Sequence, residues 1–164
     1  MRVIGLAGWS GAGKTTLARR LIPALTATGL RVSTLKHAHH SFDIDKPGKD
    51  SWEHRQAGAT QVMIASTERW ALMHELRGAP EPSLAELLSH LSPVDLVLVE
   101  GFKRGAQPKI EVHRQANGKP FLHPEDPSIV VLASDTDLPV PLPRVDLDDV
   151  EAIAALVLAH AAPI

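Results

Sequence analysis

Short apolar runs and stretches with helical spacing alternate along the first part of the chain. Residues 2–7 are mostly apolar and continuous, which predicts a buried strand. Over about 14–28, leucine recurs every four residues, as on one face of a helix. Pro23 lies inside this helix and should kink it or break one of its backbone hydrogen bonds. A second strand is expected over 31–35.

The same patterns predict the remaining elements. These are a short helix (51–57), a hairpin (61–65 and 69–74), a helix capped by Ser83 and Glu86 and running to about 91, strands (95–99, 109–113 and 129–133), a proline-rich connector (139–143) and a last helix from Val150. Alternating strand and helix signals are typical of a mainly parallel sheet. We therefore expect an α/β fold, three-layered, with a mainly parallel central sheet plus an antiparallel hairpin. With no internal repeats, residues 1–164 are expected to form a single domain.

Composition narrows the functional classes only slightly. The net charge of −2 gives no general attraction to nucleic acid or to anionic membranes, so neither is expected as a partner. The absence of cysteine excludes disulfides, thiolate metal sites and thiol nucleophiles. No run approaches the ~18 apolar residues of a membrane span, and the sequence shows no signal-peptide pattern at its start. These features favour the cytoplasm.

The strongest motif lies between the first strand and the first helix. Gly-x4-Gly-Lys-Thr is a Walker A phosphate loop, in which backbone N–H groups and the helix N-terminus hold phosphate oxygens. Lys14 would reach the β- and γ-phosphates, and the Thr15 hydroxyl would ligate Mg²⁺. The predicted phosphate-binding residues are Gly8, Trp9, Ser10, Gly11, Ala12, Gly13, Lys14, Thr15 and Thr16.

A magnesium site also needs an acidic group. Glu100 ends the apolar run 96–99, as in a Walker B strand, and would lie at the carboxyl edge of the sheet, where such folds bind ligands. Its alternative role is to cap a helix or form a salt bridge. In the polar loop 36–50, Asp43 or Asp45 could join the magnesium shell or orient water. The predicted metal ligands are Thr15, Asp45 and Glu100, and the predicted catalytic residues are Lys14, Asp45 and Glu100.

The loop 36–50 carries further polar candidates. Lys36 and His37 begin it, directly after the second strand, and are expected to contact the nucleotide. His37, His39 and His40 could bind a transition metal, although solvated side chains are the commoner state of such runs.

The sequence indicates the base only weakly. Asp135 follows a predicted strand and could read guanine, or it could be a turn residue in Ser-Asp-Thr. Asn117, in Asn-Gly-Lys-Pro, does not fit the Asn-Lys-x-Asp guanine motif.

Several stretches together resemble one family, the molybdopterin-guanine dinucleotide biosynthesis protein B (MobB) family. They are 8–17, 36–51 with Arg55 and 57–59, 95–103 and 109–114, and the likeness covers about residues 1–135. It implies a homodimer that binds GTP and Mg²⁺, hydrolyses GTP weakly, and assists a MobA-like nucleotidyltransferase that joins GMP to molybdopterin. Trp9 stands where the MinD-like branch of P-loop proteins has an extra lysine, so an intersubunit lysine finger is not expected.

The resemblance also assigns residues. Lys14, Thr15 and Thr16 carry over as phosphate and Mg²⁺ residues. An active-site or partner surface is implied for Lys36, His37, Asp43, Asp45, Pro47, Gly48, Lys49, Asp50, Glu100, Gly101 and Lys103.

Two other functions compete with this one. The histidine-rich loop allows a GTPase metallochaperone for nickel enzymes, although the lack of cysteine weakens it. The phosphate loop alone allows a small-molecule kinase, but no arginine-rich lid is apparent. We therefore predict a GTP-binding accessory protein of molybdenum cofactor biosynthesis, a weak GTPase at most.

Overall fold

The computed structural model describes residues 1–38, 42–103 and 105–164. The chain divides into two compact units, one of residues 1–39 with 87–164 and the other of residues 40–86. The expected single-domain organisation stays a prediction. Among the described residues, no helix is long and apolar enough to cross a membrane.

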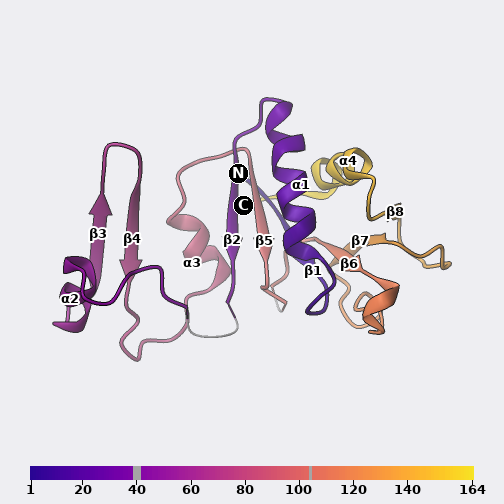
Figure 1. The fold of residues 1–164 in the computed structure, drawn as a ribbon. Coiled ribbons are helices and arrows are strands. Elements are labelled where there is room, and N and C mark those ends of the chain that lie inside the picture. Colours follow the sequence, from indigo (N-terminus) through magenta and orange to yellow (C-terminus); the bar gives the residue numbers. More distant parts are fainter. Residues whose placement is uncertain (39–41, 104) are drawn as a thin grey trace. The chain divides into compact units, whose positions relative to one another are not determined.

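The first unit is built on a mainly parallel sheet (Figure 1). Within the described residues the strand order is β2-β5-β1-β6-β7-β8, and β9 pairs with the start of β1 in the antiparallel sense. The strands are β1 (Arg2–Ala7), β2 (Val32–Lys36), β5 (Leu96–Glu100), β6 (Lys109–His113), β7 (Ile129–Ser134), β8 (Arg144–Asp146) and β9 (Ala162–Pro163). The predicted α/β fold is confirmed. β8 and β9 were not predicted.

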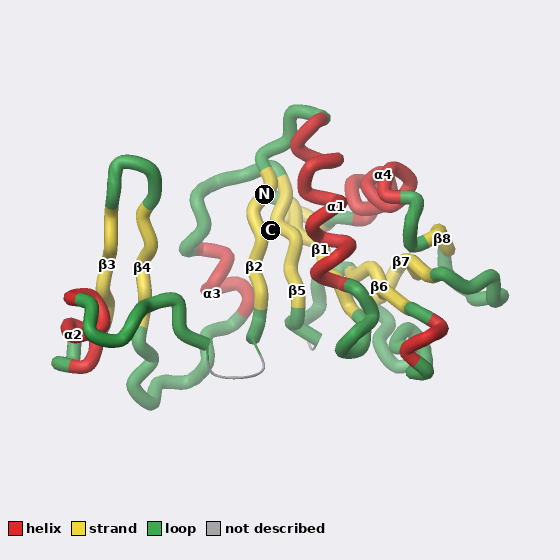
Figure 2. Tube along the Cα trace, viewed as in Figure 1, coloured by secondary structure: helices red, strands yellow, loops and turns green. Residues whose placement is uncertain are grey.

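Two helices pack together on one face of this sheet (Figure 2). They are α1 (Lys14–Ala27) and α4 (Val150–His160). Leu17, Leu21 and Leu25 of α1 are buried in one core cluster with Ile4 and Leu6 of β1, as the leucine spacing predicted. Pro23 lies inside α1, which nevertheless continues to Ala27, so Pro23 does not end the helix.

The second unit is small. It contains α2 (Asp50–Gln56) and the predicted hairpin, formed by the antiparallel strands β3 (Gln61–Ala65) and β4 (Trp70–His74). α3 (Leu84–Ser89) follows and begins at the predicted capping box, in which the Ser83 N–H and hydroxyl each donate to Glu86 Oε2 at 2.7 Å.

The parallel register brings the carboxyl ends of several strands to one edge of the sheet. Glu100 of β5 lies opposite both Leu6 of β1 and Lys36 of β2, and His113 of β6 lies opposite Ser134 of β7. In open parallel α/β sheets this edge is where ligands bind.

Candidate nucleotide-binding site

The phosphate loop connects β1 to α1 at this edge. Gly8, Gly11 and Gly13 have positive φ angles of 146°, 82° and 98°, a region that side chains with a Cβ rarely adopt. A Cβ at Gly8 would also lie only 2.5 Å from the carbonyl oxygen of Val112. Glycine is therefore required here both by the backbone conformation and by the neighbouring strand β6.

Lys14 is folded back onto this loop. Its Nζ donates to the carbonyl oxygens of Gly8 at 2.8 Å and Trp9 at 3.0 Å. Burial lowers the pKa of Lys14; Glu100 opposes this effect, whereas Lys103 and Lys36 add to the lowering. Three positive side chains therefore gather near one partly buried carboxylate, an arrangement that favours an anionic ligand.

Glu100 lies beside the first turn of α1. The Thr15 hydroxyl donates to Glu100, with Oγ1 at 3.3 Å from Oε1 and 3.4 Å from Oε2, and Lys36 Nζ lies 3.9 Å from Oε1. A hydroxyl and a carboxylate oxygen beside a phosphate loop are the ligand types that Mg²⁺ takes in P-loop proteins. The site thus fits Mg²⁺ through Thr15 and Glu100, and Thr16 follows on the exposed side of α1. Their roles as ligands stay predictions.

His37 directly follows β2 and lies beside Glu100. Its N–H donates to the Glu100 carbonyl oxygen at 2.8 Å, and its ring centroid lies 4.9 Å from that of Phe102. Gly101 has a φ of 101°, and a Cβ there would lie 2.7 Å from the His37 carbonyl oxygen. His39 and His40 lie outside the described residues, and the residues that are described contain no cluster of three or more His, Asp or Glu able to hold a metal.

Asp45 belongs to the second unit and is held there by hydrogen bonds. Its Oδ1 accepts from the Ser51 hydroxyl at 2.8 Å and from the Lys46 N–H at 3.0 Å, and its Oδ2 lies 3.3 Å from Arg55 Nε. Arg55 also pairs with Asp43, and this hydrogen bond lowers the pKa of the Asp43 carboxyl. These contacts give Asp45 a role in its own loop, and its predicted role at the metal stays a prediction.

The turn after β6 contacts the phosphate loop, which the sequence did not indicate. It contains the 3₁₀ helix η1 (Gln115–Asn117). Asn117 Nδ2 donates to the Ser10 carbonyl oxygen at 3.0 Å. Asp135 Oδ1 accepts from the Gln115 N–H at 2.9 Å, and this hydrogen bond stabilises the turn. The predicted role of Asp135 in reading a base is not tested.

The polar side chains of β6 hold the following loop against the other face of the sheet. Glu111, only 1% exposed, accepts from the N–H groups of Leu122 at 2.6 Å and His123 at 3.0 Å. The indole N–H of Trp9 donates to the Pro120 carbonyl oxygen in the same loop, at 2.8 Å. The 109–113 segment, which the resemblance singled out, thus connects the phosphate loop to residues 120–128.

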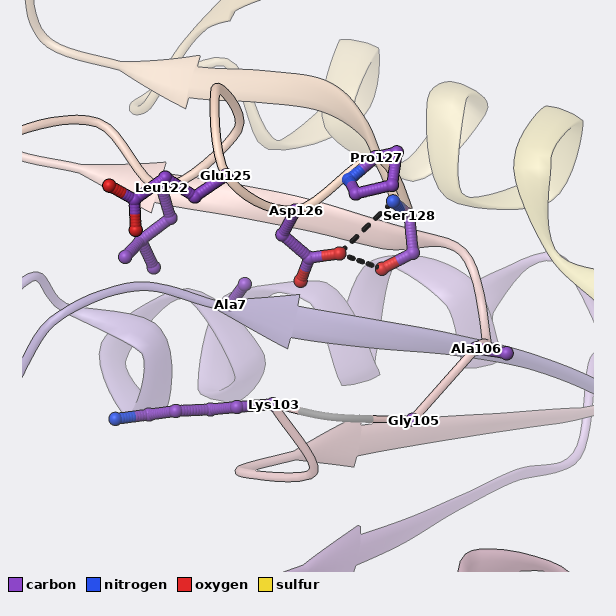
Figure 3. A pocket seen from close by; sticks show the side chains of 9 residues that line it. All are labelled: Ala7, Lys103, Gly105, Ala106, Leu122, Glu125, Asp126, Pro127 and Ser128. Carbon is purple, nitrogen blue, oxygen red and sulfur yellow. Dashed lines mark hydrogen bonds between the residues drawn. The ribbon is translucent and has the colours of Figure 1, made fainter.

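Lys109 of β6 is buried, and its hydrogen-bond partners line a cleft. Its Nζ donates to the Gly105 carbonyl oxygen at 2.7 Å and to Asp126 Oδ2 at 3.0 Å, and also to the Ser128 hydroxyl. Figure 3 shows Asp126 bonded to Ser128 across from Lys103. The cleft has a volume of about 690 Å³. None of the residues that line it is a predicted nucleotide-binding residue.

The fold and this edge of the sheet define a P-loop NTPase fold: a phosphate loop between β1 and α1, and an acidic residue at the end of the neighbouring strand β5. The model of the family "Molybdopterin guanine dinucleotide synthesis protein B" (MobB) matches residues 3–135. The chain belongs to this family.

Two relatives with a similar sequence are named for the same biosynthesis. The molybdopterin-guanine dinucleotide biosynthesis adapter protein of Escherichia coli is 45% identical over 159 residues, covering 95% of this chain and 91% of its own. The adapter protein of Haemophilus influenzae is 45% identical over 149 residues, covering 89% and 80%. A crystal structure of molybdopterin-guanine biosynthesis protein B matches with a TM-score of 0.77 at 28% identity, covering 96% of this chain and 98% of the other.

Proposed function

We propose that this chain is a GTP-binding adapter protein of molybdopterin guanine dinucleotide biosynthesis. It acts in the cytoplasm and assists a MobA-like nucleotidyltransferase that joins GMP to molybdopterin. The observation that carries the proposal is the position of Glu100 beside Thr15, on a phosphate loop whose glycines have the required backbone conformation. The names of the relatives, which describe them as adapter proteins of this biosynthesis, supply the biological role.

Individual residues have distinct parts in nucleotide binding. The N–H groups of the loop from Gly8 to Lys14 hold phosphate oxygens, and Lys14 exchanges its two carbonyl acceptors for the β- and γ-phosphates. Thr15 and Glu100 hold Mg²⁺, which neutralises phosphate charge when bound. Lys36 and His37 line the same site.

We expect hydrolysis to be weak. The Glu100 carboxylate contacts both the Thr15 hydroxyl and the Lys36 ammonium group. These contacts fit a role in holding Mg²⁺ better than a role in activating water. An arginine finger contributes ~10³–10⁵ to the rate of GTPases, and Ras without one turns over at only about 3–5 × 10⁻⁴ per second. Phosphate release by the purified chain should not exceed about 10⁻² per second, the intrinsic rate of GTPases that carry an arginine in cis; turnover of tens per second without a partner would contradict the adapter role.

We also propose a homodimer. The β3–β4 hairpin carries exposed apolar side chains on one face, with Met63 and Trp70 each 62% exposed and Leu72 41% exposed. A two-stranded sheet is marginally stable alone in water, so pairing this face with a second copy would stabilise it. The variant Met63→Glu/Leu72→Glu should sediment as a monomer, whereas Glu68→Ala at the hairpin turn should leave the dimer intact; a monomeric unmodified chain would contradict the proposal.

Competition binding tests the ligand most directly. GTP, ATP and molybdopterin would be titrated against the isolated chain with and without Mg²⁺. We expect GTP to bind more tightly than ATP and Mg²⁺ to increase its affinity. A clear preference for ATP would favour the small-molecule kinase instead.

A further inference from the structure

The turn after β6 lies against the phosphate loop at two of its glycines. Arg114 is the first residue of this turn. A Cβ at Gly13 would lie 3.3 Å from Arg114 Nε, and a Cβ at Gly11 would lie 3.2 Å from Asn117 Oδ1. The guanidinium of Arg114 therefore lies next to the space that a side chain at Gly13 would occupy, at the start of α1.

The surroundings of Arg114 are already positively charged. Lys14 is the first residue of α1, and the N-terminal end of a helix carries a partial positive charge. A further cation is costly at this place unless an anion compensates it. The acidic group that faces Arg114 is Asp135, and the ion pair is long, with Nη1 4.0 Å from Oδ2. The side chain of Arg114 is 37% exposed, so a ligand can reach it.

Asp135 fixes the turn that presents Arg114. One carboxylate oxygen accepts from the Gln115 N–H at 2.9 Å, and the other faces Arg114. The turn is also fixed at its far end, where Asn117 donates to Ser10. Arg114 is thus held over the loop from both sides.

We propose that Arg114 binds the phosphate chain of the nucleotide and that Asp135 is the positioning residue that holds Arg114 there. This assignment rests on the proposed function, because it adds a residue to the same site. Guanidinium groups present several N–H donors in a fixed plane, which suits phosphate oxygens better than a point charge does.

Calorimetric titration of the full chain with GDP and with inosine diphosphate tests Arg114. These ligands share the phosphate chain and differ at the edge of the base. Arg114→Gln should weaken both by about tenfold or more, the value of a hydrogen bond to a charged group, and Arg114→Lys should weaken both less. The matched control is Arg31→Gln, which removes an Arg–Asp pair with Asp95 (3.6 Å) at the opposite end of the sheet and should bind as the unmodified chain does.

Three results would overturn the assignment to the phosphates. Affinities within twofold of the unmodified chain would show that Arg114 makes no contact with the ligand. A loss that differs between the two ligands would place the contact on the base. Failure of the unmodified chain to bind either ligand would overturn the proposed function, and this inference with it.

A double-mutant cycle tests Asp135. Asp135→Asn should weaken GDP binding in the unmodified chain and have no further effect when Arg114 is already Gln, because the two act as one unit. Additive losses would overturn the positioning role. Thermal unfolding of each variant establishes that it is folded, and Arg114→Lys retains a charge should the Gln variant unfold.

Discussion

The Thr15 hydroxyl donates to the Glu100 carboxylate, with Oγ1 3.3 Å and 3.4 Å from its two oxygens. The two residues are 85 positions apart in the sequence. The parallel pairing of β1 with β5 brings them together, because Leu6 lies opposite Glu100 and the phosphate loop begins two residues after Leu6. This contact joins the phosphate loop to the acidic residue that we propose as a ligand of Mg²⁺.

Glu100 should therefore determine how strongly Mg²⁺ promotes GTP binding. Glu100→Gln removes the charge and keeps the shape, so we expect the gain in affinity from Mg²⁺ to fall by about tenfold. Affinity without Mg²⁺ should be unchanged or tighter, because a negative group next to the phosphates is lost. Calorimetry with and without Mg²⁺ measures both values.

The control for this variant is Asp95→Asn. Asp95 lies immediately before β5, at the opposite end of the strand from Glu100, where it accepts from the Arg31 N–H at 2.7 Å. Its variant should respond to Mg²⁺ as the unmodified chain does. An unchanged Mg²⁺ response in Glu100→Gln would exclude Glu100 from the metal site.

Lys109 should be important for stability. It is 2% exposed, and its ammonium group donates to three oxygens. Lys109→Met leaves Asp126 without its cation, and breaking a buried ion pair costs roughly 3–5 kcal/mol. Because the Asp126 side chain is 27% exposed, we expect a loss near the lower end, about 3 kcal/mol, in the free energy of unfolding measured with urea. The exposed Lys119→Met should change it by less than about 0.5 kcal/mol.

Asp126 should make the protein less stable in acid. Burial alone would raise the pKa of Asp126, but hydrogen bonds from Ser128 and Lys109 outweigh it and lower the pKa below 3.8. A carboxyl with a lowered pKa in the folded state stabilises the fold above its unfolded pKa, and this contribution disappears as the pH falls through the folded value. The free energy of unfolding should therefore decrease as the pH falls through and below 3.8.

Asp126→Asn separates this contribution from that of other carboxyls. Asp43 and Asp95 also have lowered pKa values and add to the acid sensitivity of the unmodified chain. The Asn variant should thus lose less stability over the same pH range. A pH profile parallel to that of the unmodified chain would contradict the proposed role of Asp126.

The sequence predicted the elements whose signals are local. The apolar run of β5 and the leucine spacing of α1 each define an element without reference to the rest of the chain. The capping box of Ser83 and Glu86, which begins α3, is likewise a local signal. The edge strand β8 is only three residues long and follows a proline-rich segment, so it carried no such signal.

The part of the site that belongs to a known sequence motif was predictable. The phosphate loop and Glu100 follow from a known spacing and from the rule that ligands lie at the carboxyl ends of parallel strands. Arg114 ends the 109–114 stretch of the family resemblance, but no nucleotide-binding motif gave a role to it or to Asn117, and both reach the loop only because β6 pairs with β1. The burial of Glu111 depends on the N–H groups of a loop later in the chain, which no local pattern indicates.

The central claim is that the phosphate loop binds GTP through Lys14. Calorimetry tests this claim. GTP with Mg²⁺ would be titrated into the unmodified chain, into Lys14→Ala and into the control Arg19→Ala, which lies on the exposed side of the same helix. We predict one site per chain in the unmodified protein and in Arg19→Ala, and at least a hundredfold weaker binding in Lys14→Ala, because its charge meets the β- and γ-phosphate oxygens. Undiminished GTP affinity in Lys14→Ala would contradict the account.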